Sequence, residues 1–175
     1  MDDVVAILVE EVRELARLGA TYLQIDAPQY PLLIDPTWRA FYEGRGWPAE
    51  RWLSYGVELD NAVIDAAPGV TFGFHLCRGN QDSRWLVSGG FDPLALVPDD
   101  KQVILGLVTT KGPRPETEDE LEARVREAAA LVDLERLGVG TQCCFATSVV
   151  GNALTIEDEE RKLRTIARTS HRIWG

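Results

Sequence analysis

Side chains with metal-binding chemistry occur where two apolar runs of the sequence end. His75 and Cys77 follow the run 70–74, and Cys143 follows the run 137–142. All three cysteines of the chain lie in these two places. Thiolate and imidazole are ligands that suit zinc, so zinc chemistry is the leading hypothesis. A His-x-Cys motif alone also occurs by chance, and its context must therefore carry the argument.

Two further residues, Cys144 and Asp26, allow more than one interpretation. Cys144 adjoins Cys143, and because successive residues of a strand point to opposite faces, Cys144 is interpreted as a small buried side chain rather than a ligand. Asp26 follows a third apolar run, 21–25. It either starts a turn before Ala27 and Pro28 or contacts a substrate, and the sequence leaves both roles open.

The elements that position these residues alternate between helix and strand. Periodicity and capping residues predict helices over 2–18, within 35–67, over 117–132 and over 155–173. Strands are predicted over 21–25, 70–74, 102–108 and 137–142. This order predicts an α/β fold with parallel strands and outer helices, in which functional residues collect at the carboxyl ends of the strands. Asp26, His75, Cys77 and Cys143 all occupy such ends.

Length and charge restrict the class of protein. The 175 residues suit a single domain, 1–175, and the net charge of -10 opposes the phosphate backbone, so nucleic acid is not an expected partner. The longest apolar runs, about seven residues, are too short to span a bilayer. The start Met1-Asp2-Asp3 lacks the basic character of a signal peptide. Reduced thiols and these features together predict a cytoplasmic protein.

The sequence around these residues resembles the C-terminal catalytic half of the cobalamin-independent methionine synthase family, including its shorter, core-only type. The matching segments are Tyr22–Asp26 with Pro28, 55–61, 75–80, Gly89 and Gly90, 105–107, and Gln142 and Cys143 with Phe145. The resemblance covers most of the chain. It implies a TIM-type (β/α)8 barrel that binds zinc.

The resemblance also implies roles for individual residues. His75, Cys77 and Cys143 would be zinc ligands, and Asp26 would hold the amino group of the substrate. The implied reaction is that of a zinc-dependent 5-methyltetrahydropteroyltriglutamate-homocysteine S-methyltransferase in methionine biosynthesis, with a homocysteine-like thiol and a methyl-folate as substrates. Zinc would lower the pKa of the thiol and so provide a nucleophile at neutral pH.

The chain departs from the family pattern in three ways. A complete barrel has eight βα units, whereas this sequence predicts about half of one, the C-terminal half. A strand carrying a glutamate zinc ligand has no counterpart, as if one strand-helix unit were missing between Gly90 and Phe91. Cys144 stands where family members usually have glycine. The partial barrel implies self-association or a second chain that supplies the N-terminal half-barrel.

Three classes of function remain open at this stage. The first is the methyltransferase activity, carried out with the missing half of the barrel. The second is another zinc-thiolate alkyl transferase, such as an epoxyalkane:coenzyme M transferase, because the same zinc site serves any thiol. The third is a noncatalytic fragment of the family. Independent enzyme activity of this chain is therefore left undecided.

Overall fold

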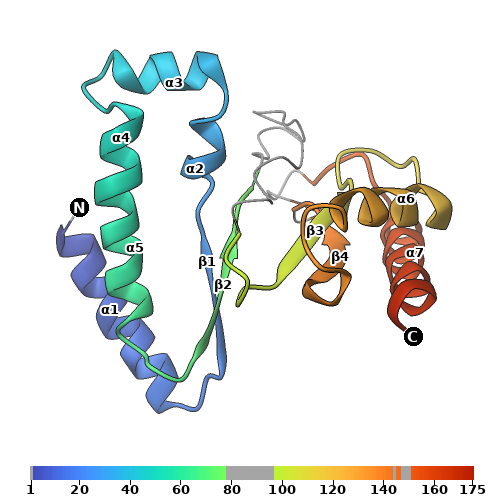
Figure 1. The fold of residues 1–175 in the computed structure, drawn as a ribbon, viewed down its shortest axis with the longest axis horizontal. Coiled ribbons are helices and arrows are strands. Elements are labelled where there is room, and N and C mark those ends of the chain that lie inside the picture. Colours follow the sequence, from blue (N-terminus) through green and yellow to red (C-terminus); the bar gives the residue numbers. More distant parts are fainter. Residues whose placement is uncertain (1, 78–96, 144, 147–150) are drawn as a thin grey trace. The chain divides into compact units, whose positions relative to one another are not determined.

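The computed structural model describes residues 2–77, 97–143, 145–146 and 151–175. It consists of two compact units, unit 1 (Met1–Arg78) and unit 2 (Gly79–Gly175). The elements of unit 1 are α1 (Asp2–Arg17), β1 (Tyr22–Asp26), α2 (Gln29–Leu32), α3 (Pro36–Glu43), α4 (Ala49–Arg51), the π-helix η1 (Trp52–Gly56), α5 (Val57–Ile64) and β2 (Thr71–His75). Those of unit 2 are β3 (Val103–Val108), α6 (Glu118–Ala128), the 3-10 helix η3 (Leu134–Arg136), β4 (Leu137–Thr141) and α7 (Ile156–Trp174), all labelled in Figure 1 where there is room.

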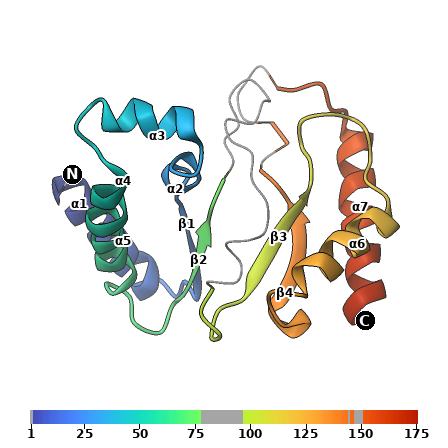
Figure 2. The ribbon, with the colours of Figure 1, turned by 45° about the horizontal axis from the view of Figure 1, so that its top comes forward.

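Unit 1 pairs its two strands in parallel and covers them with helices. Tyr22 lies opposite Thr71, and the register continues to Asp26 opposite His75. Figure 2 shows α1 and α5 packed beside each other on one side of these strands. The buried core joins Val12 of α1 to Val63 of α5 and to Ala67, three residues after α5, because the apolar stripe of each amphipathic helix must be shielded from water.

The predicted helical stretch 35–67 is divided into separate helices. It begins as predicted, with the Asp35 carboxylate accepting hydrogen bonds from the backbone N–H groups of Thr37 and Trp38. Gly46 then adopts a positive φ of 79°, and Pro48 cannot continue a helix that approaches it. The chain therefore turns before α4. The short helix α2, which directly follows Pro28, lies outside the predicted helices.

Unit 2 repeats the same arrangement. β3 and β4 pair in parallel, with Val103 opposite Leu137 and Val108 opposite Thr141. Its core packs Leu105 and Leu137 of the strands against Val125 of α6. The predicted capping boxes are confirmed at Thr117 and Thr155, which begin α6 and α7. The helix α6 ends at Ala128, four residues earlier than predicted. After it the chain forms turns that include hydrogen bonds from an N–H to the carbonyl three residues before it.

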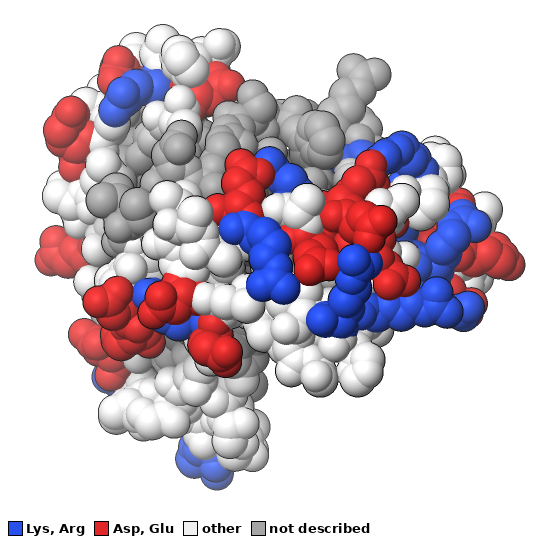
Figure 3. All heavy atoms as spheres, turned by 45° about the vertical axis from the view of Figure 1, so that its right-hand side comes forward, with Lys and Arg blue, Asp and Glu red and all other residues white. Residues whose placement is uncertain are grey.

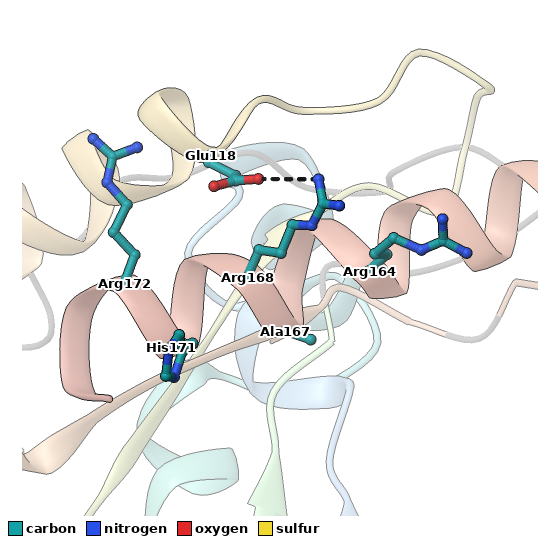
Figure 4. Close-up of a pocket in the computed structure, with 6 residues that line it drawn as sticks. All are labelled: Glu118, Arg164, Ala167, Arg168, His171 and Arg172. Atoms are coloured by element: carbon teal, nitrogen blue, oxygen red, sulfur yellow. Dashed lines mark ion pairs between the residues drawn. The ribbon is translucent and has the colours of Figure 1, made fainter.

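Ion pairs join the two helices of unit 2. Arg168 and Arg172 of α7 reach Glu118 at 3.7 Å and Asp119 at 2.6 Å on α6, and Figure 4 shows the first of these pairs. Figure 3 shows basic and acidic side chains interleaved on the face in view. Each of these exposed ion pairs contributes little to the free energy of unfolding.

The predicted α/β class is confirmed, since both strand pairs are parallel and are packed against helices. Within the residues that the structure describes, no helix has both the length and the apolar character that a membrane span needs. The prediction that residues 1–175 form a single domain stays a prediction.

Candidate metal centre

The His-x-Cys motif lies at the carboxyl end of β2. His75 is the last residue of the strand, and Cys77 follows two residues later. Their ligand atoms lie within 4.8 Å of each other. Two ligands of one tetrahedral zinc ion are separated by about 3.5 Å, given bond lengths of about 2.0 Å to nitrogen and 2.3 Å to sulfur. Small side-chain rotations therefore suffice for both residues to bind the same ion.

Asp26 lies beside this motif. It ends β1 directly opposite His75, and the Asp26 Oδ1 atom is 4.0 Å from His75 Nε2. That separation is too long for a hydrogen bond, so the two side chains lie near each other without forming one. The backbone N–H of Ala27 donates to the His75 carbonyl at 2.9 Å and fixes the two strand ends together.

The carboxylate of Asp26 remains available to a ligand. Its side chain is 67% exposed. Among the described residues it accepts no hydrogen bond from the turn that follows, which is the contact that a turn-starting aspartate would make. The turn interpretation therefore lacks its characteristic contact, and the substrate role of Asp26 stays a prediction.

Cys143 occupies the corresponding place in unit 2. It follows β4 by two residues and is partly buried. The N–H of the intervening Gln142 donates to the Val108 carbonyl at 2.9 Å, so the pairing with β3 continues beyond the assigned strand. Cys144, the segment 78–80 and the Gly89-Gly90 pair lie outside the described residues.

The donor set has the composition of a metal site. His75 and Cys77 in unit 1 and Cys143 in unit 2 supply one imidazole and two thiols. Nitrogen and sulfur donors suit zinc better than magnesium or calcium, which prefer oxygen.

A tyrosine near the end of β1 escaped sequence reasoning. The Tyr30 hydroxyl donates to Asp60 Oδ2 at 2.5 Å, and the Tyr30 ring lies 5.7 Å from that of Phe74 in β2. Burial raises the pKa of Tyr30, and the hydrogen bond to the Asp60 carboxylate raises it further. The two partners are 30 residues apart, so no local pattern could have indicated the pair. It fixes the chain just after Asp26.

Comparison with solved structures identifies the class of fold. A B12-independent methionine synthase from Shewanella sp. W3-18-1, solved with selenomethionine, matches 97% of this chain with a TM-score of 0.71 and 17% identity. A putative vitamin-B12 independent methionine synthase from Listeria monocytogenes matches 99% with a TM-score of 0.66 and 24% identity. The matches cover 53% and 55% of those chains. The predicted resemblance and the partial barrel-like fold are thereby confirmed at the level of structure.

Sequence comparison gives relatives whose own roles are open. The chain is 30% identical to YxjH and 29% identical to YxjG of Bacillus subtilis (strain 168), both named only as uncharacterized proteins. Each match spans 89% of this chain and 49% of the relative, so the chain covers about half the length of the curated relatives it matches. No family model matches the sequence.

Proposed function

We propose that this chain contributes the metal-binding half of a zinc-dependent S-methyltransferase that methylates a homocysteine-like thiol with a methyl-folate. The observation that supports this most directly is the His75-x-Cys77 pair, with ligand atoms within 4.8 Å at the end of β2, in a fold shared with B12-independent methionine synthases. Cys143, at the end of β4, is the proposed third ligand.

Each residue of the proposed site has a separate task. His75, Cys77 and Cys143 bind the metal, and Asp26 binds the amino group of the thiol substrate, since an exposed carboxylate attracts an ammonium group. When bound, zinc supplies the Lewis acidity that keeps a coordinated thiol deprotonated at neutral pH.

Thiol binding to a cobalt-substituted protein tests this function. Cobalt(II) takes the place of zinc in sites of this kind and absorbs strongly when sulfur binds it. Adding homocysteine is expected to increase the sulfur-to-cobalt charge-transfer absorbance beyond that of the protein cysteines. Methionine, which has no thiol, serves as the matched control. An unchanged spectrum with homocysteine would contradict the proposal.

The substrate role of Asp26 predicts a specific pattern for Asp26→Asn. The variant removes the charge but keeps the size of the side chain, so homocysteine affinity should fall about tenfold or more while the melting temperature changes little. Calorimetric titration and thermal unfolding measure the two effects. Glu50→Asn, at an exposed position of α4 away from β1, is the control. A lower melting temperature with unchanged affinity would instead support the turn interpretation.

The partial barrel predicts association. Apolar side chains are exposed in both units, including Ile7 at 63%, Leu18 at 67% and Ile104 at 67%. Burying them favours a second copy or a chain that supplies the other half of the barrel. Sedimentation at micromolar concentrations should show a species heavier than the monomer that dissociates on dilution. A monomer that unfolds cooperatively would contradict this prediction.

A further inference from the structure

The loop after β3 contains two buried polar groups that have no hydrogen-bond partner among the described residues. Thr110 is 1% exposed, and its Oγ1 atom makes no hydrogen bond in the described part of the chain. The Nζ atom of Lys111 is shielded from solvent and likewise has no hydrogen-bond partner there. An unpaired ammonium group away from water is costly, and native proteins rarely keep one without a function. These two groups therefore point to a ligand.

The rest of the loop is satisfied by its own contacts. The Thr109 N–H donates to Glu116 Oε1 at 2.9 Å, and the other carboxylate oxygen of Glu116 accepts from Lys162 Nζ at 3.0 Å. Asn152 Nδ2 donates to the Thr110 carbonyl at 3.2 Å. The nearby carboxylate is thus already occupied by another lysine. These contacts involve the loop backbone and Glu116, and they pair neither Thr110 Oγ1 nor Lys111 Nζ.

The loop also leaves the sheet at the edge where ligands bind in parallel α/β folds. Val108 ends β3 opposite Thr141, which ends β4, and Figure 2 shows the two strands side by side. Lys111 follows β3 by three residues, and Cys143 follows β4 by two. Both therefore emerge from the same edge within unit 2.

We propose that Lys111 and Thr110 bind the acid group, a carboxylate or a sulfonate, of the small thiol whose sulfur reaches the metal. The ammonium group offers three donors and the hydroxyl one, which suits an acid with several acceptor oxygens. This inference rests on the proposed function, because it assigns the far end of the same substrate. It adds a residue that selects acidic thiols over neutral ones.

A structural role and a binding role for Lys111 predict opposite changes in stability. If the lysine served only the fold, Lys111→Met would lower the melting temperature. If it serves a ligand, removing an unpaired buried charge should leave the melting temperature of the ligand-free protein unchanged or raise it, while affinity falls. Lys101→Met is the matched control, since Lys101 is an exposed lysine just before β3.

The experiment titrates zinc-loaded wild-type protein and both variants with two pairs of thiols by calorimetry. One pair is homocysteine and its methyl ester, which masks the carboxylate, and the other is 2-mercaptoethanesulfonate and neutral 2-mercaptoethanol. The acidic member of at least one pair should bind at least about tenfold more tightly to the wild-type protein and to Lys101→Met. Lys111→Met should lose that preference, and the pair that shows it identifies a carboxylate or a sulfonate.

The failures are distinguishable. If thiols bind but Lys111→Met keeps the full preference for acidic thiols, or if no preference exists, the inference is overturned and the proposed function stands. If no thiol binds the zinc-loaded wild-type protein, the proposed function fails and the inference fails with it. A lower melting temperature of Lys111→Met with unchanged affinities would show that the lysine belongs to the fold alone.

Discussion

Replacing Cys77 or Cys143 with serine is expected to reduce bound zinc from one ion per chain to nearly none. Each substitution exchanges a thiolate, a strong zinc ligand, for a hydroxyl that stays protonated at neutral pH. The two remaining protein ligands should bind zinc too weakly to keep it in the presence of a chelator. Metal analysis of the purified protein, after dialysis against a weak chelator, gives the stoichiometry directly.

Cys144→Ser is the matched control for this experiment. It makes the same chemical change at the adjacent position, which is interpreted as a nonligand, and should retain zinc. Unchanged stoichiometry in both Cys77→Ser and Cys143→Ser would contradict the metal site. Loss in Cys77→Ser alone would confine the ion to the His75-x-Cys77 motif and remove Cys143 from the proposal.

Replacing Lys162 with methionine is expected to destabilise the protein by about 3–5 kcal/mol, the usual cost of breaking a buried ion pair by removing one partner. Lys162 is completely buried, and its Nζ atom donates to the Arg114 carbonyl at 2.6 Å and to Glu116 Oε2 at 3.0 Å. Methionine would leave Glu116, whose side chain is only 13% exposed, without its counter-charge. Denaturant unfolding measures the change in the free energy of unfolding.

Two further variants define the cause of this loss. Arg164→Met removes an exposed cation from the same helix, labelled in Figure 4, and should change the free energy of unfolding by less than about 0.5 kcal/mol. Lys162→Met combined with Glu116→Gln removes both charges and should restore part of the stability. If the double variant is no more stable than Lys162→Met, the ion pair is not the source of the effect.

The sequence alone determined the features that depend on neighbours within one helical turn or one strand. The capping boxes at Thr117 and Thr155 and the end of α1 near Gly19, with its positive φ of 98°, were predictable, because each depends on residues three or four positions apart. The strands over 21–25 and 70–74 were predicted from short apolar runs, and β1 and β2 are each shifted by one residue from them. Local hydrogen bonding and the period of side-chain burial carry that information.

Only the tertiary structure decided which of these residues meet. The register of β1 with β2 brings Asp26 opposite His75, although 49 positions separate them in the sequence. In α7, Lys162 resembles the exposed arginines around it, yet it is the cation that becomes buried, because Glu116 and Arg114 approach it from more than 40 residues away. Strand pairing and burial depend on contacts between distant segments, and a single sequence does not encode those contacts in any local pattern.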